Sequence, residues 1–516
     1  RFRQVTHLGD NVVTAVPSPD GQLYALVTSG EVDGRPAFAL YTVQENGDEL
    51  RRIAQSEQED DAEDAPAGAP GAGISALRFA KDGRSIYYRE GNALWTAPVG
   101  SSTGGDSASG GAGSGSSRSG RTETVRHRLD FTLHLEVDLD RERRQIFAEA
   151  WRVMRDRFYD KAMHGADWTA ARALYEPLLG DVADREELHA VISQMIGELN
   201  ASHTGISGGG ETDPTAVRTR FPGFELVPDP TGFYKVATIY RNGPATRDYA
   251  KVKVGDFLLA VDGVPLQAGE NYWRLYGSAA GKKLVLTLNS KPTAEGAWTT
   301  RIETVGPGGY ATLQYEKWVD DHRAQVDKLS NGEIGYLHIR QMNPAALRKF
   351  MADFADNHFK KALVIDQRFN PGGGIDQELL MVLGQRQYQY TRGRDSLTVT
   401  RPQRGFFGPM VVLQNERSTS DAEVFPAGFR QLKLGKTVGV TTYGAVIGTG
   451  AFRLMDGSQI RTPGTGLWDV GGQNLENYGV PPDVEVDNRP EDFFAGRDSQ
   501  LEKAVEVLRA ELAAGR

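Results

Sequence analysis

An almost uninterrupted apolar run at Ala362–Asp366 constrains the fold more than any other segment, because it predicts a strand buried on both faces. Three further runs with strand character occur at residues 334–339, 410–414 and 438–440. Stretches with helical periodicity lie between them, at about residues 345–354, 376–383 and 421–432. Alternating strands and helices predict a parallel sheet with right-handed crossovers, and hence an α/β domain over residues 307–516.

Two of these strands run into polar turns, and ligands of such sheets bind beyond the carboxyl ends of the strands. The first turn, residues 367–374, ends in three consecutive glycines whose N–H groups no side chain covers. The second turn, residues 415–421, presents hydroxyl groups at the start of a helix. Together they can place an oxygen nucleophile beside donors for a developing oxyanion.

Both turns also have a plainer interpretation. Gly372, Gly373 and Gly374 suit an ordinary loop, and the Lys-Ser/Thr pair of a phosphate-binding loop does not follow them. Ser420 and Glu423 have the spacing of a capping box, and on these residues alone Ser420 is better explained as a helix cap than as a nucleophile. Ser418 and Thr419 are rival hydroxyls in the same turn.

Composition excludes several classes of site. The chain has 516 residues, no cysteine and a formal net charge of −9. Without cysteine there are no disulfides, thiolate nucleophiles, thiolate zinc sites or iron–sulfur clusters. The modest charge argues against nucleic acid or an acidic membrane surface as the main partner. No apolar run approaches the roughly 20 residues of a membrane helix. No pair of histidines has a metal-ligand spacing such as His-x-x-x-His. A metal-dependent hydrolase is therefore a weak alternative.

The first 138 residues contain two copies of one strand pattern. Each copy has a strand, an Asp-Gly turn at Asp20-Gly21 or Asp82-Gly83, and further strands. About four strands per unit predict propeller blades, and two blades are too few for a propeller of roughly 4–8. Residues 1–138 are therefore predicted to be the end of a β-propeller whose gene product extends upstream of Arg1. Its Gly-, Ser- and Pro-rich segments at about 57–74 and 99–122 are predicted to be disordered loops.

Residues 139–210 have helical periodicity, and their last helix runs out into His203. Taken alone, His203 is best explained as a histidine that interacts favourably with a helix C-terminus. However, the preceding helix is strongly apolar and a glycine-rich stretch follows. This context predicts an imidazole on a rigid support beside an open space.

Residues 211–306 return to a strand pattern. Within them, residues 253–263 read as a turn, a buried strand and a second turn. This segment resembles the most recognisable part of PDZ domains, which capture extended peptides by strand addition. An ordinary small β-domain is the alternative.

In order along the chain, the four regions resemble the C-terminal half of the tricorn proteases, which belong with the carboxyl-terminal processing peptidases of family S41. Four motifs carry the resemblance: residues 197–203, 366–374, 415–421 and 476–483. The resemblance implies a multidomain α+β chain. Its parts would be a partial β-propeller, a helical core domain (139–210), a PDZ-like domain (211–306) and an α/β core domain of the ClpP/crotonase type (307–516).

The resemblance also implies roles for six residues. Ser420 matches the family's nucleophile and His203 its general base. Ser202 and Glu476 match the residues that orient the base. The oxyanion donors would be the backbone N–H groups of Gly373 and Asp421.

These roles imply a serine peptidase that hydrolyses oligopeptides or unfolded polypeptides through an acyl-enzyme, with no cofactor and no metal. By the same resemblance it would be a cytoplasmic homo-oligomer, a hexamer, with no nucleic-acid or membrane partner. The alternative from another class is a catalytically silent PDZ-type peptide-binding scaffold. One departure concerns specificity: the acid linked to a preference for basic residues is missing at residues 388–391, with Asp395 further on.

Overall fold

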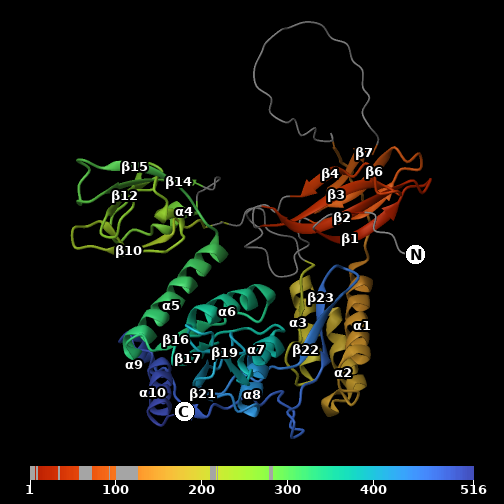
Figure 1. The fold of residues 1–516 in the computed structure, drawn as a ribbon. Coiled ribbons are helices and arrows are strands. Elements are labelled where there is room, and N and C mark those ends of the chain that lie inside the picture. The colour runs from red at the N-terminus through yellow and green to blue at the C-terminus, as the bar shows by residue number, and fades with distance from the viewer. Residues whose placement is uncertain are drawn as a thin grey trace. The chain divides into compact units, whose positions relative to one another are not determined.

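The computed structural model describes residue 6 and residues 10–32, 35–56, 73–91, 93–99, 126–209, 217, 219–277 and 283–515. The predicted disordered loops at 57–74 and 99–122 lie almost wholly outside these residues. The chain divides into two compact units, residues 1–136 with 217–312, and residues 137–216 with 313–516 (Figure 1). Each unit is described by itself.

The first unit begins with two four-stranded antiparallel sheets, each a simple meander. The strands of the first are β1 (Asn11–Pro17), β2 (Leu23–Val32), β3 (Arg35–Gln44) and β4 (Arg51–Ser56). Those of the second are β5 (Ile74–Phe79), β6 (Ser85–Glu90), β7 (Ala93–Pro98) and β8 (His127–Leu129). Gly21 and Gly83 sit in the two predicted Asp-Gly turns with φ of 73° and 71°. One apolar core joins the two sheets. The repeat of four strands is thus observed, and its place in a propeller stays a prediction.

The same unit contains a six-stranded antiparallel sheet with its own apolar core. Its strands are β10 (Phe224–Pro228), β11 (Tyr234–Ile239), β12 (Phe257–Val261), β13 (Val264–Pro265), β14 (Lys283–Asn289) and β15 (Trp298–Glu303), accompanied by the short helix α4 (Trp273–Tyr276). The predicted turn-strand-turn segment is β12 between Gly255 and Gly263, both with positive φ. Its assignment as PDZ-like stays a prediction.

The second unit is built on the predicted parallel sheet, which has five strands. Their order is β16 (Ile334–His338), β17 (Ala362–Asp366), β20 (Met410–Gln414), β21 (Lys436–Gly439) and β24 (Val484–Glu485). Strand β17 is buried on both faces as predicted, because Leu363 and Ile365 join one apolar core while Ala362 and Val364 join another.

Helices supply the opposite sides of these two cores. The first core contains side chains of α6 (Pro344–Asn357), α7 (Asp376–Leu383) and α8 (Asp421–Gln431). The second contains side chains of α5 (Pro307–Ser330) and α10 (Ser499–Ala513). A small hairpin of β18 (Gln389–Thr391) and β19 (Val399–Arg401) and a short helix α9 (Pro490–Phe494) complete this part.

The predicted helical region comprises α1 (Leu139–Arg157), α2 (Trp168–Tyr175) and α3 (Arg185–Gly197). It shares its core with a distant part of the chain, since Leu454 and Ile460 are buried among its side chains. They belong to the segment that contains β22 (Gly448–Arg453) and β23 (Gln459–Thr465), and these two strands form a three-stranded sheet with β9 (Ile206–Ser207). Residues just after His203 therefore pair with the chain that follows β21.

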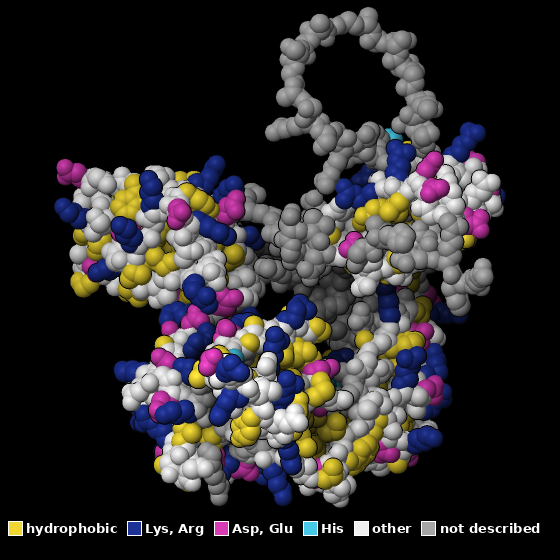
Figure 2. All heavy atoms as spheres, viewed as in Figure 1, with side chains coloured by type: hydrophobic (Ala, Val, Ile, Leu, Met, Phe, Trp, Pro, Cys, Tyr) yellow, Lys and Arg dark blue, Asp and Glu magenta, His cyan; other side chains and the backbone are white. Residues whose placement is uncertain are grey.

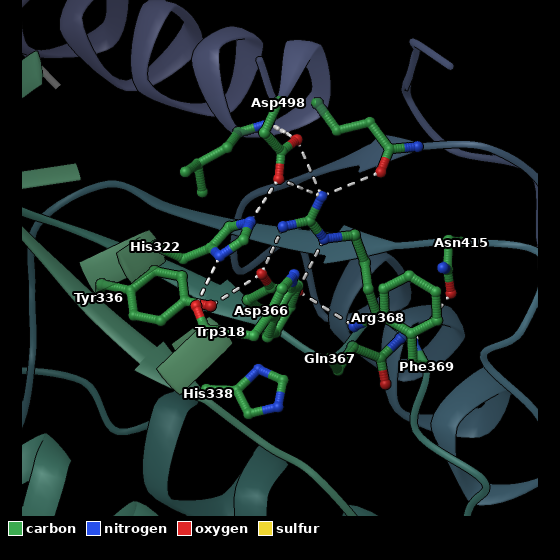
Figure 3. A network of polar contacts seen from close by, with 12 residues as sticks. Trp318, His322, Tyr336, His338, Asp366, Gln367, Arg368, Phe369, Asn415 and Asp498 are labelled. Atoms are coloured by element: carbon green, nitrogen blue, oxygen red, sulfur yellow. Dashed lines mark hydrogen bonds and ion pairs between the residues drawn. The ribbon is translucent and has the colours of Figure 1, made fainter. Parts of the chain in front are cut away.

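A buried ionic network anchors the turn that follows β17 (Figure 3). The Arg368 side chain, 1% exposed, donates to both carboxylate oxygens of Asp366 at 3.0 and 2.7 Å. It also donates to Asp498, just before α10, at 2.8 Å. His322 of α5 reaches the same Asp498 carboxylate at 2.8 Å. One cation thus joins the end of β17 to α10, and through Asp498 to α5.

The described surfaces mix both signs of charge with apolar side chains in the view of Figure 2. Among the described residues, no helix is long and apolar enough to cross a membrane.

Replacing Arg368 by methionine is expected to destabilise the second unit by about 3–5 kcal/mol, because two buried carboxylates lose their cation. Urea unfolding followed by circular dichroism measures this loss. Arg323→Met is the matched control, since Arg323 forms partly exposed ion pairs with Asp320 and Asp353 and should cost about 1 kcal/mol or less. Equal effects of the two substitutions would contradict the role given to Arg368.

Candidate active site

The two predicted polar turns meet at the carboxyl ends of the adjacent strands β17 and β20. The Thr419 N–H donates to the Asn370 carbonyl at 3.0 Å. Closer to the helix, Gly372 faces Ser420, and a Cβ atom on Gly372 would lie 2.6 Å from the Ser420 Cβ. With φ of 91°, Gly372 also has a backbone conformation that side chains disfavour. Glycine is therefore required here for close approach as well as for conformation.

Ser420 is the residue immediately before α8, and its backbone is strained, with φ of 59° and ψ of −124°. Such a conformation costs about 1–3 kcal/mol in a residue other than glycine. Two acceptors hold the Ser420 N–H: the Ala445 carbonyl at 2.8 Å and the Glu423 carboxylate at 3.1 Å. The strained turn is thus fixed from two sides, and Ser420 remains half-buried.

The structure distinguishes the Ser418 hydroxyl from the two rival hydroxyls of this turn. Ser418 is fully buried, and its hydroxyl donates to the Gln367 carbonyl at 3.3 Å while it accepts from the Asn415 N–H at 3.2 Å. These bonds close the turn. Thr419 and Ser420 are both half-buried.

Glu423 was predicted only as part of a capping box, and the structure gives it more contacts. Its carboxylate, fully buried, accepts from the Gly444 N–H at 2.6 Å, the Ala445 N–H at 2.7 Å and the Thr442 hydroxyl at 2.6 Å, in addition to the Ser420 N–H. Burial raises the pKa of the Glu423 carboxyl, and these hydrogen bonds oppose the rise. Glu423 therefore ties residues 442–445 to the turn that carries Ser420.

The two N–H groups predicted as oxyanion donors, those of Gly373 and Asp421, differ from their neighbours in their hydrogen bonds. Met342 bonds the residues on either side of Gly373, because its N–H donates to Gly372 at 2.9 Å and its carbonyl accepts from Gly374 at 2.8 Å. In such a bridge the N–H of the central residue, Gly373, points away from Met342. Within the described part of the chain, no acceptor takes a hydrogen bond from the N–H of Gly373 or of Asp421.

His203 lies in a chain of hydrogen bonds with Ser202 and Glu476. The Ser202 hydroxyl is 3.0 Å from the His203 Nδ1 and donates to the Glu476 carboxylate at 3.1 Å. The same carboxylate accepts from the Ser202 N–H at 2.7 Å. Since the hydroxyl donates to Glu476, it accepts from Nδ1–H, which leaves the lone pair of Nε2 available as a base.

Burial lowers the pKa of the His203 imidazole from its ordinary value of 6.5, and the positive charge of Arg461 lowers it further. The negative charge of Glu476 acts in the opposite direction. The imidazole is therefore neutral at pH 7, as a general base must be.

The irregular segment between β21 and β22 connects the two halves of the site. Its Ala445 carbonyl holds the Ser420 N–H, while the next residue, Val446, donates to the Glu476 carboxylate at 3.0 Å. Further on, the Thr449 hydroxyl donates to the His203 carbonyl at 3.2 Å. No hydrogen bond joins His203 directly to Ser420 in the described residues, so this segment is their connection.

Sequence reasoning missed the roles of Glu423, Thr442 and Val446. The capping-box spacing drew attention to Glu423, but the acceptor pattern of its carboxylate depends on a segment about 20 residues later. Thr442 and Val446 lie in no motif, and Val446 contributes only its backbone. No local signal identifies such residues. Among the described residues, no three histidine or acidic side chains are grouped so as to hold a metal ion.

Comparisons with known proteins find two families. The model described as peptidase family S41 matches residues 333–486, and the one described as tricorn protease C1 domain matches residues 139–197. The chain is similar to tricorn protease homolog 1 of Streptomyces coelicolor, with 32% identity over 74% of this chain and 37% of the relative. It is also similar to the tricorn protease of Thermoplasma acidophilum, with 29% identity over 71% of this chain and 35% of the relative.

A solved structure supports the fold. The crystal structure of the tricorn protease matches with a TM-score of 0.76 and 23% identity, covering 98% of this chain and 47% of that one. The chain thus spans less than half the length of these relatives.

Opposite shifts of the His203 pKa are expected from two substitutions. Glu476→Gln removes the negative charge that raises it and should lower the pKa. Arg461→Met removes the positive charge that lowers it and should raise the pKa. NMR titration of labelled imidazoles measures both, with His203→Ala to assign the resonance. A shift in the same direction for both variants would rule out these charges as the cause.

Proposed function

Because the chain is related to the tricorn proteases and carries a domain of peptidase family S41, we propose that it is a serine peptidase acting on oligopeptides or unfolded polypeptides. The observation that carries this proposal is the arrangement around Ser420. A strained serine at a helix N-terminus lies against a glycine turn. Two backbone N–H groups, those of Gly373 and Asp421, have no acceptor among the described residues. Such donors stabilise the negative charge that develops on a carbonyl oxygen during acyl transfer.

In the proposed reaction the Ser420 hydroxyl oxygen attacks the carbonyl carbon of the scissile peptide bond, and His203 Nε2 takes the hydroxyl proton. The carbonyl π electrons move to the oxygen, which the N–H groups of Gly373 and Asp421 stabilise. Collapse of the tetrahedral intermediate breaks the C–N bond, and the imidazolium gives its proton to the leaving amine. Water, activated by the same imidazole, then releases the acyl group from Ser420.

Ser202 and Glu476 orient the base in this scheme. The Glu476 carboxylate, 3% exposed, stabilises the imidazolium through the Ser202 hydroxyl. Direct contact between His203 and Ser420 belongs to the substrate complex, since catalytic hydrogen bonds often tighten only there. The strained Ser420 and the helix dipole of α8 both favour this chemistry.

The proposal also covers the sheets of the first unit. The two four-stranded sheets would be propeller blades, and the six-stranded sheet a PDZ-like module that guides extended peptides. We also propose that the protein forms a homo-oligomer, by resemblance a hexamer, and that it is located in the cytoplasm. Light scattering on the purified full-length protein tests the oligomeric state.

Ser420→Ala is expected to abolish both labelling by a fluorophosphonate and cleavage of a peptide library. Replacing His203 by alanine should lower turnover by about 10⁴-fold or more, because the hydroxyl loses its base. Mass spectrometry of the library measures cleavage and side-chain preference together.

Thr419→Ala is the matched control, since it removes a neighbouring hydroxyl of the same turn and should keep labelling and turnover. Equal labelling of the wild type and Ser420→Ala would disprove the assignment of the nucleophile. Peptide binding without cleavage of any library member would favour a peptide-binding scaffold instead.

A further inference from the structure

The carboxyl group of Asp421 has no part in the proposed reaction, yet it is buried next to the serine that the reaction uses. Asp421 is the first residue of α8, and its side chain points to the end of the turn at residues 367–374, called the glycine turn here. One carboxylate oxygen accepts from the Ile375 N–H at 2.8 Å and from the Asp376 N–H at 3.2 Å. These are the residues at which the glycine turn ends and α7 begins.

These hydrogen bonds cap the N-terminus of α7, which has no capping side chain of its own. The residue before the helix is Ile375, whose side chain has no acceptor, and no local side chain caps the helix. The first N–H groups of a helix need an acceptor from elsewhere. Asp421 provides it from a different helix.

No cation explains the burial of this carboxyl. Asp421 is 7% exposed, and none of the described lysines and arginines pairs with it. Burial raises its pKa to about 7, and the nearby Asp376 carboxyl contributes to the rise. A buried acid without a cation is costly, and the hydrogen bonds from the Ile375 and Asp376 N–H groups offset part of that cost.

The glycine turn is consequently tied to the serine turn at both ends. At one end the Asn370 carbonyl accepts from Thr419 at 3.0 Å. At the other end the Asp421 carboxylate accepts from Ile375 and Asp376. Gly373, the first predicted oxyanion donor, lies between these two sets of hydrogen bonds. The second predicted donor is the N–H of Asp421, whose carboxylate makes the second set.

We propose that the Asp421 side chain is a positioning residue: by capping α7 it holds the Gly373 N–H at a set place relative to its own N–H, and so shapes the oxyanion site. This inference rests on the proposed function. It predicts a loss in transition-state stabilisation rather than in substrate binding.

Asp421→Ala is expected to lower kcat by about 10- to 100-fold, part of the loss seen when an oxyanion donor is removed outright. KM should change little, because the displaced donor acts on the developing oxyanion. Affinity for a peptide boronate, whose tetrahedral adduct occupies the same site, should fall in proportion to kcat. Asp421→Asn keeps an oxygen that accepts the same two hydrogen bonds and should retain most of the turnover.

Amide hydrogen exchange provides a readout that does not depend on activity. In Asp421→Ala the amides of residues 372–383 should exchange faster than in the wild type, while those of α10 should not. Glu378→Ala is the matched control, since Glu378 is an exposed acid in the first turn of the same helix. It should change neither kcat nor exchange.

Unchanged kcat or unchanged boronate affinity in a folded Asp421→Ala protein would overturn the proposal. If that variant does not fold, Asp421→Asn decides: loss of turnover in a folded Asp421→Asn protein would overturn it as well. A wild-type protein that is neither labelled by a fluorophosphonate nor cleaves peptides defeats the proposed function instead. In that case faster exchange in Asp421→Ala still supports the cap on α7, and unchanged exchange overturns it.

Discussion

The close contact between Gly372 and Ser420 is the constraint on which the rest of the site depends. It brings two turns from neighbouring strands to a separation at which no side chain fits between them. The serine can then lie beside two backbone N–H groups, those of Gly373 and Asp421, that have no acceptor among the described residues. Because the contact joins main chain to main chain, it needs supports that hold both turns rigidly.

Buried carboxylates provide those supports. Glu423 gathers three backbone N–H groups and a hydroxyl around the Ser420 turn, while Glu476 connects Ser202 with the segment that contains Val446. Asp421 ties the glycine turn to α8. An ionised carboxylate can accept about four hydrogen bonds, so a single side chain can fix several loop segments that have no regular structure of their own. The strain at Ser420 is maintained by this surrounding network.

A buried cation, Arg368, supports the end of one strand. Arg368 forms ion pairs with both Asp366 and Asp498 and thereby attaches the end of β17 to α10. Arg368 lies at the beginning of the glycine turn, so that turn is anchored in the core by Arg368 at its beginning and by Asp421 at its end. Around Ser420, in contrast, the buried acids accept hydrogen bonds from backbone N–H groups, and Asp421 itself occupies the N-terminus of α7.

The sequence alone determined the elements and the motifs. A continuous apolar run gave the five-residue strand β17, and helical periodicity gave the helix α7, both with their observed bounds. The order of apolar and polar residues that carries these signals is a local property of the chain. The motifs drew attention to Ser420, His203, Ser202, Glu476 and the glycine turn. Only the tertiary structure decided which acceptors hold them. Glu423 contacts residues about 20 positions away and Glu476 binds Ser202 across more than 270 positions. Such contacts depend on how the chain returns in space, and no local pattern of residues encodes them.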